Sequence, residues 1–156
     1  MYRQVNDFLK EWSIAAKGTA QVMNAMTDEK LDQSIVKGHS SLGWLSWHLV
    51  SATGYFSYLA GLQVPMIQQD TPVPSTVAEI VAAYENVAKC VNEEAAKLSD
   101  ENLLEEVKGI NGPVAKGELL RTLIDHQTHH RGQMTVLLRQ AGLQVPGIMG
   151  PTKEMQ

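Results

Sequence analysis

Hydrophobic residues recur at mixed three- and four-residue spacing in four separate segments of the chain, as in amphipathic helices. The later three segments span residues 43–61, about 77–98 and about 117–141. The pattern therefore predicts an all-α protein built from four helices. The first segment runs from residue 2 to about 26, and its apolar stripe comprises Val5, Phe8, Leu9, Trp12, Ala15, Ala16, Thr19, Val22 and Met23.

Polar residues mark where the middle two helices begin. Ser40 or Ser41 can cap the second helix, and Ser75 or Thr76 can cap the third, because their side chains accept hydrogen bonds from free backbone N–H groups. Residues 63–74 hold three prolines and few periodic apolar positions. This stretch is predicted to be a long linker between the second and third helices.

The other connections are predicted from turn residues. Residues 32–38 connect the first two helices, and residues 99–107 form a short acidic turn after the third. Residues 108–117, KGINGPVAKG, are predicted to be a loop. The closing segment, residues 145–156, contains prolines and glycines that cannot continue the fourth helix. It is expected to lie over the bundle or over a neighbouring subunit.

The hexapeptide AGLQVP occurs at residues 60–65 and again at 141–146. Each copy places Gly where a helix would end and Pro shortly beyond it, so we interpret both copies as stop signals. His48 precedes the first copy by nearly the same interval at which His130 precedes the second. The two histidines are therefore expected at similar heights in the bundle, whichever way the helices run.

Length and charge restrict the class of protein. A chain of 156 residues is most simply one domain, residues 1–156, long enough to bury a core. The formal net charge of −4 and the scattered basic residues argue against nucleic-acid binding, so a small-molecule partner is expected.

A single cysteine, Cys90, excludes an internal disulfide. The amino-terminal segment lacks a signal-peptide core, and no apolar stretch has transmembrane length, so a cytoplasmic location without membrane contact is expected.

Three histidines carry the candidate chemistry. His126 and His130 lie four residues apart, so on a helix they share one face, and the apolar stripe around them directs both inward. His48 lies on the apolar stripe of the second helix. Two buried neutral imidazoles side by side each need a polar partner, and a divalent cation satisfies both. The alternative, three hydrogen-bonded core histidines, is disfavoured because all three fall at one height.

All-nitrogen ligation suits zinc, nickel, copper or ferrous iron. Three ligands leave one coordination position for water or substrate, which is typical of a catalytic site. His129 lies on a polar flank, so a place at the rim of the site is expected. His129 or Asp125 could accept a proton, and Asp125 could instead orient a ligand ring or be a solvated carboxylate. Arg131 is expected at the surface, where it could hold an anionic substrate.

The motifs GWLSWHL and HQTHHRGQ and the closing segment AGLQVPGIMGPT resemble the DinB-like (DinB/YfiT) family of metal-dependent proteins, over nearly the whole chain. The resemblance implies a four-helix bundle of up-down-down-up topology, with residues 63–74 serving as a crossover. It also implies a divalent metal, commonly zinc or nickel, on His48, His126 and His130. A homodimer is a further expectation from the resemblance.

Related proteins in that family include transferases of low-molecular-weight thiols such as bacillithiol, mycothiol or glutathione, and a thiol-dependent isomerase. Many other members have no assigned activity, so the resemblance implies the site and only suggests a reaction. The three-histidine site suits a thiol S-transferase or a hydrolase, because a cation lowers the pKa of a bound thiol or water. The alternative is a non-catalytic stress-response protein in which the metal only ties two helices together. The sequence leaves these possibilities open.

Overall fold

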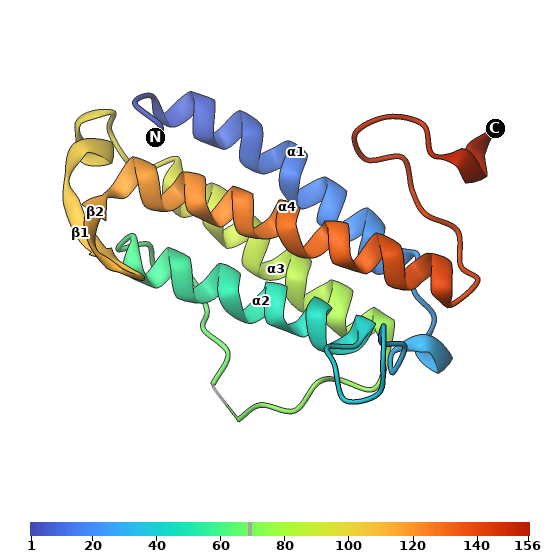
Figure 1. Cartoon of the computed structure of the whole chain (residues 1–156). Coiled ribbons are helices and arrows are strands. Elements are labelled where there is room, and N and C mark those ends of the chain that lie inside the picture. Colours follow the sequence, from blue (N-terminus) through green and yellow to red (C-terminus); the bar gives the residue numbers. More distant parts are fainter. Residues whose placement is uncertain (69) are drawn as a thin grey trace.

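Four helices form the body of the molecule, and the computed structural model describes residues 1–68 and 70–156. They are α1 (Val5–Asn24), α2 (Leu42–Leu59), α3 (Val77–Ala95) and α4 (Lys116–Gln140). Helices α1 and α2 each pack against both α3 and α4, so the four helices form a bundle (Figure 1). The predicted all-α four-helix class is confirmed. Among the described residues, no helix combines the length and apolar character needed to span a bilayer.

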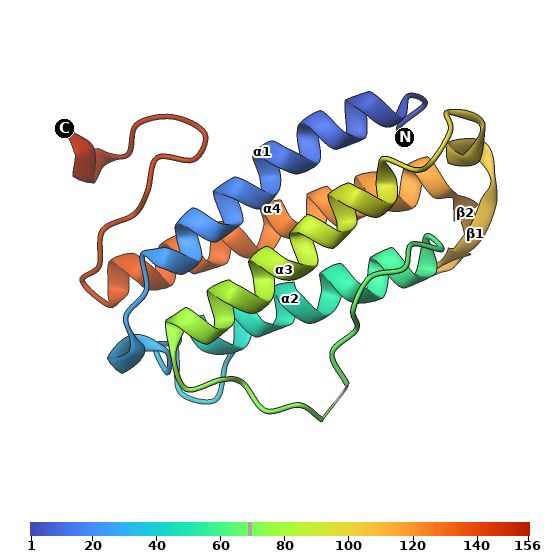
Figure 2. The same cartoon turned by 180° about the vertical axis from the view of Figure 1, so that it is seen from behind.

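The helices follow the order up-down-down-up. In both views, α1 and α4 run in one direction, and α2 and α3 run in the other (Figures 1 and 2). The connection between α2 and α3 therefore returns the chain along the length of the bundle, as the crossover does in the expected topology. As a consequence, α2 and α4 are antiparallel neighbours.

The polar caps predicted for the middle helices are present. The Ser41 side chain accepts a hydrogen bond from the backbone N–H of Trp44 at 3.2 Å, so Ser41 rather than Ser40 begins α2. The Thr76 hydroxyl accepts a hydrogen bond from the backbone N–H of Glu79 at 3.3 Å and begins α3. These caps satisfy N–H groups that have no partner inside the helix.

Both copies of AGLQVP stop a helix in the same way. Gly61 has φ +78° and Gly142 has φ +74°, values that L side chains rarely adopt. The residue after each glycine donates its N–H back to the preceding turn: Leu62 to the carbonyl of Ser57, and Leu143 to that of Leu138, both at 2.9 Å. The interpretation of the repeat as a stop signal is confirmed.

The segment between α3 and α4 differs from the prediction. Instead of a loop over residues 108–117, the chain forms an antiparallel hairpin of β1 (Glu106–Gly109) and β2 (Gly112–Ala115). Each strand has only four residues and pairs only with the other, so the hairpin offers too little alternation for a period-two pattern to be recognised. The structure also contains short 3-10 helices, namely η1 (Asp28–Lys30), η2 (Glu101–Leu104) and η3 (Lys153–Met155).

The bundle centre holds a buried polar network that joins all four helices. Gln127 of α4 accepts hydrogen bonds from Thr19 of α1 at 3.0 Å and from Tyr84 of α3 at 2.9 Å. Its amide nitrogen donates to Thr53 of α2 at 3.0 Å. All four residues are fully buried. These hydrogen bonds form at only one relative position of the helices along the bundle axis. The network therefore fixes the position of α2 relative to α4 beside His126.

The closing segment lies over the bundle, which is one of the two expected placements. Val145 is buried in the core. A Cβ on Gly18 of α1 would lie 2.7 Å from a methyl carbon of Ile148, so the segment packs closely on that helix. Arg139 of α4 forms an ion pair with Glu154 at 2.6 Å. These contacts close one side of the bundle without covering α2.

Candidate metal centre

The three predicted histidines meet between α2 and α4. The Nε2 atom of His126 lies 3.2 Å from Nε2 of His48 and 3.2 Å from Nε2 of His130. One ligand atom from each residue lies within 4.8 Å of the others. The antiparallel packing of α2 on α4 thus brings His48 to the pair that one helical turn already holds together. The three histidines are positioned to hold a metal ion.

The chemistry of the three nitrogens fits a cation better than hydrogen bonds among themselves. A neutral imidazole nitrogen carries either one proton or one lone pair, so Nε2 of His126 cannot be fully satisfied by two ring nitrogens at once. A cation can accept all three lone pairs. Two nitrogens bound to one tetrahedral zinc at about 2.0–2.1 Å lie roughly 3.3–3.4 Å apart, close to the observed spacing.

The environment keeps these imidazoles in the neutral, metal-binding form. All three are half-buried. Burial, followed by the neighbouring histidines, lowers the pKa of His126 to about 4. Burial also lowers the pKa of His48 and of His130, with each losing further basicity to another histidine nearby. Neutral rings at pH 7 need not release a proton before they bind a metal.

The three-histidine cluster is more accessible to solvent than the sequence pattern indicated. The apolar stripe of α2 was expected to place His48 in the core, yet Trp44 and Tyr55 on that stripe are 46% and 48% exposed. Trp44 stacks on His48 with ring centroids 4.9 Å apart, and Phe56 lies 5.3 Å from His126. The three histidines therefore have apolar walls and an approach from solvent, because one face of α2 is left uncovered.

Gln133 is a site residue that the sequence analysis missed. Its side-chain oxygen accepts a hydrogen bond from Nδ1 of His130 at 2.7 Å. An amide oxygen can only accept, so the proton of His130 resides on Nδ1 and the lone pair of Nε2 faces the cluster. The signal available in the sequence was the i, i+3 spacing of the two residues on a helix.

His129 lies at the rim, as expected. It is exposed, and its ring centroid lies 4.8 Å from that of His130. The Gln133 amide nitrogen donates to Nε2 of His129 at 3.3 Å, so Gln133 links the two histidines. His129 is adjacent to the three-histidine cluster without belonging to it.

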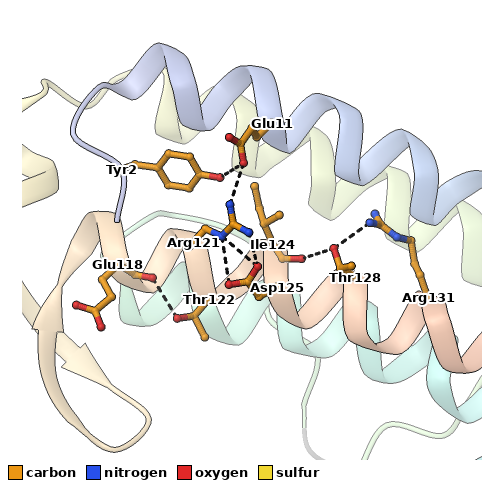
Figure 3. Close-up of polar contacts among 9 residues, drawn as sticks. All are labelled: Tyr2, Glu11, Glu118, Arg121, Thr122, Ile124, Asp125, Thr128 and Arg131. Atoms are coloured by element: carbon orange, nitrogen blue, oxygen red, sulfur yellow. Dashed lines mark hydrogen bonds and ion pairs between the residues drawn. The ribbon is translucent and has the colours of Figure 1, made fainter. Parts of the chain in front are cut away.

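The structure does not bring Asp125 to the cluster. Its exposed carboxylate accepts hydrogen bonds from Arg121, the shortest at 2.6 Å, and Arg121 also reaches Glu11 of α1 (Figure 3). Nδ1 of His126 is buried and has no hydrogen-bond partner among the described residues. The orienting acceptor that Asp125 could have supplied is therefore not in place.

Arg131 occupies a different environment from the surface position expected. It is 8% exposed and points toward α1, where its guanidinium donates to the carbonyl of Ala15 at 2.6 Å (Figure 3). It also donates to the hydroxyl of Thr128 at 3.0 Å. Helical periodicity places Arg131 on the side of α4 that faces α1, away from the side that faces α2. The residue ties two helices together instead of lining the histidine site.

Comparison with known proteins agrees with this architecture. The chain is 40% identical over 155 residues to the uncharacterized protein YrdA of Bacillus subtilis (strain 168), an alignment covering 99% of this chain and 93% of that protein. It superimposes on a DinB-like protein from Bacillus cereus ATCC 10987 with a TM-score of 0.89 and 38% identity, covering 94% of this chain and 99% of the other.

A more distant structure shares the fold. The DinB-like protein YjoA of Bacillus subtilis superimposes with a TM-score of 0.73 at 15% identity, covering 93% of this chain and 99% of that one. The model of the DinB family matches residues 1–156, the whole of the chain. The bundle, the histidine cluster and these matches together show that the chain belongs to the DinB family.

Proposed function

We propose that the protein is a metal-dependent enzyme that holds zinc or nickel on His48, His126 and His130 and acts as a thiol S-transferase or a hydrolase. The observation that carries the proposal is the convergence of one ring nitrogen from each of three half-buried histidines within 4.8 Å of one another. A closed structural site usually takes four protein ligands, whereas a catalytic site takes three and keeps a position open.

The bound cation would lower the pKa of a coordinated thiol or water and so favour the nucleophilic form near neutral pH. The protein's own residues would hold and orient the ligands. Gln133 fixes the tautomer of His130 through its 2.7 Å hydrogen bond. Trp44 and Phe56 limit the tilt of the other two rings by ring contacts. Rigid ligands preserve one geometry of the site.

We further propose His129 as the residue that accepts a proton at the rim. Its exposure and its position beside His130 support this role. Among the described residues, its Nε2 atom accepts only the 3.3 Å hydrogen bond from Gln133, which is longer than the bond that Gln133 makes with His130. An exposed imidazole within reach of a bound substrate is a common general base.

A homodimer in the cytoplasm remains part of the proposal. Support comes from the exposed aromatic residues on α2, namely Trp44, Tyr55 and Tyr58, of which Tyr58 is 62% exposed. Large exposed aromatic side chains are enriched at protein interfaces. Light scattering coupled to gel filtration, which measures the mass in solution, tests the dimer.

A second candidate is a structural metal without catalysis. The observation in its favour is that the ligands come from two helices, so a cation would tie α2 to α4. The two functions differ in what metal removal changes. A structural metal predicts a lower melting temperature and no turnover of any thiol or ester, whereas the catalytic site predicts turnover that depends on the metal.

The first experiment is metal content by mass spectrometry on untagged wild-type, His48→Ala and His126→Ala proteins. We expect about one divalent ion per chain in the wild type and loss in both variants, since each removes one of three ligands. His39→Ala is the matched control, because His39 lies outside the cluster. No bound metal in wild type after zinc or nickel is supplied would overturn the proposal.

The second experiment separates the two reactions. Metal-loaded protein is supplied with bacillithiol or glutathione together with an electrophile, and separately with ester substrates without thiol. Conjugation that His48→Ala abolishes would support the transferase. Ester hydrolysis without thiol would support the hydrolase. Absence of both reactions in protein that retains its metal would favour the structural role.

A further inference from the structure

A small pocket lies next to the histidine cluster, between α2, α4 and the segment that precedes α2. Its volume is about 250 Å³, slightly below the usual range for ligand pockets. Leu45 of α2 and Leu137 of α4 contribute to it and are 2% and 4% exposed. Because these leucines belong to the bundle core, the floor of the pocket is rigid. Ile35 and Val136, both largely exposed, complete its apolar lining. We call it the loop pocket.

The loop pocket reaches the histidine cluster through Gln133. Gln133 lines the pocket and also bonds His130. Along α4, Gln133 is about 4.5 Å from His130 and Leu137 is about 10 Å from it, given the rise of an α-helix. On α2, Leu45 lies less than one turn before His48. A molecule anchored at the cluster can therefore reach the pocket past Gln133.

The lining also defines the chemistry of the occupant. Among its described residues there is no carboxylate, amino or guanidinium group, and the polar contributions come from His39, Ser40 and Gln133. An occupant with a full charge would lose hydration without gaining an ionic partner. An uncharged group gains from the four apolar side chains.

We propose that the loop pocket binds the uncharged, apolar part of a small substrate whose polar end reaches the metal on the three histidines. This inference rests on the proposed metal-dependent function and narrows its substrate class. The occupant is a short aliphatic or small aromatic group, which suits a pocket of about 250 Å³. The three polar side chains supply hydrogen bonds at the pocket's edge.

A second pocket competes for the same role. It lies between α2 and the crossover, has a volume of about 470 Å³, and is lined by Trp44, Trp47 and His48 together with residues of the crossover. We call it the crossover pocket. Its lining includes the carboxylate of Asp70 and a polar backbone, since the carbonyl of Thr71 accepts a hydrogen bond from Trp47. An apolar group gains less there than between two buried leucines.

The test uses alkyl hydroxamates of increasing length on zinc-loaded protein, measured by isothermal titration calorimetry. The hydroxamate group anchors the probe at the metal. The dependence of Kd on the length of the alkyl chain measures how far that chain is buried in the pocket. The series runs from acetohydroxamate through butyrohydroxamate to hexanohydroxamate. Each methylene that becomes fully buried should tighten binding roughly three- to fourfold. The readout is the ratio of Kd for the shortest probe to Kd for the longest.

Two matched variants distinguish which of the two pockets binds the alkyl chain of the probe. Val136→Asp places a charge in the loop pocket, and Val73→Asp places one in the crossover pocket. Both valines are exposed, 46% and 38%, so neither change disturbs the core. We expect a ratio of about tenfold or more in wild type, the same ratio in Val73→Asp, and a ratio near one in Val136→Asp.

Two results would overturn the assignment of the loop pocket while leaving the metal site intact. The first is an affinity that does not rise with alkyl-chain length in wild type. The second is a rise in affinity that Val73→Asp removes and Val136→Asp keeps. A different result overturns the proposed function as well. If acetohydroxamate itself fails to bind zinc-loaded wild type, the three histidines leave no position for a ligand, and the pocket has no anchored substrate. The two failures are therefore distinguishable in one series of titrations.

Discussion

Nε2 of His126 lies 3.2 Å from Nε2 of His48, although the two residues are 78 positions apart and belong to antiparallel helices. These two ring nitrogens repel each other when both rings are protonated. A shared cation takes a lone pair from each ring, so metal binding requires both rings to be neutral at these nitrogens. The same contact makes the stability of the bundle depend on metal and on pH.

Metal should stabilise the folded protein. Zinc at about a hundred times its Kd adds about 2.7 kcal/mol, which for a chain of this size raises the melting temperature by roughly 5–10 °C. Differential scanning calorimetry with zinc and with a chelator measures the shift. His48→Ala should lose it, and His39→Ala should keep it, since only His48 belongs to the cluster. An equal shift in His48→Ala would place the metal elsewhere.

The metal-free protein should become less stable in acid. The unfolded chain protonates His126 near its ordinary pKa, about 6.5, whereas the folded protein resists until about pH 4. The unfolded state therefore binds more protons between these values, so the free energy of unfolding falls as the pH drops through this window. His48 and His130 act in the same direction, because their pKa values are also lowered.

Urea unfolding of chelator-treated protein at several pH values measures this effect. The contribution of His126 alone is on the order of 2 kcal/mol. His126→Ala should therefore flatten the dependence in the acid range. A wild-type stability that stays constant between about pH 7 and about pH 4 would contradict the lowered pKa values.

Gln133→Leu should weaken metal binding by roughly 10–100-fold, because His130 loses the acceptor that fixes its tautomer. Competition with a chromophoric chelator measures the affinity. Gln133→Glu keeps an acceptor oxygen and should retain more affinity than Gln133→Leu. The control is Gln140→Leu, an exposed residue two turns further along α4. Equal affinities in the two leucine variants would remove Gln133 from the site.

Gln127→Met should destabilise the bundle by about 1–3 kcal/mol, because the fully buried hydroxyl of Tyr84 loses its acceptor and Thr53 loses the bond that the amide donates. The same change made in a Tyr84→Phe background should cost less, since the hydroxyl that loses its acceptor is then absent. Chemical denaturation of the four proteins in this cycle measures the coupling. Strictly additive effects would argue against a shared network.

The sequence was most informative where the signal is local. Ser41, Thr76, Gly61 and Gly142 act through hydrogen bonds or backbone angles within one turn of their own position, so helix boundaries were predicted closely. The third helix is an exception at its end: it was expected to reach about residue 98, and the structure ends α3 at Ala95. Helix ends are the least sharply encoded part of a helix.

The hairpin of β1 and β2 was missed for a different reason. It depends on pairing between Glu106–Gly109 and Gly112–Ala115, and neither strand is long enough to show alternation on its own. Arg131 illustrates the same limit among side chains. Arg131 finds its partner Ala15 more than a hundred positions away, and only the packing of α4 on α1 reveals it.

For the candidate site, the sequence by itself determined which residues could bind a metal. The four-residue spacing of His126 and His130 fixes their common face, because helix geometry is local, and the stripe and height of His48 made it the third member. The tertiary structure alone decided the rest: the 3.2 Å contacts, the open face of α2 and the loop pocket. These features arise from how α2 and α4 pack, and packing depends on contacts between residues far apart in the chain.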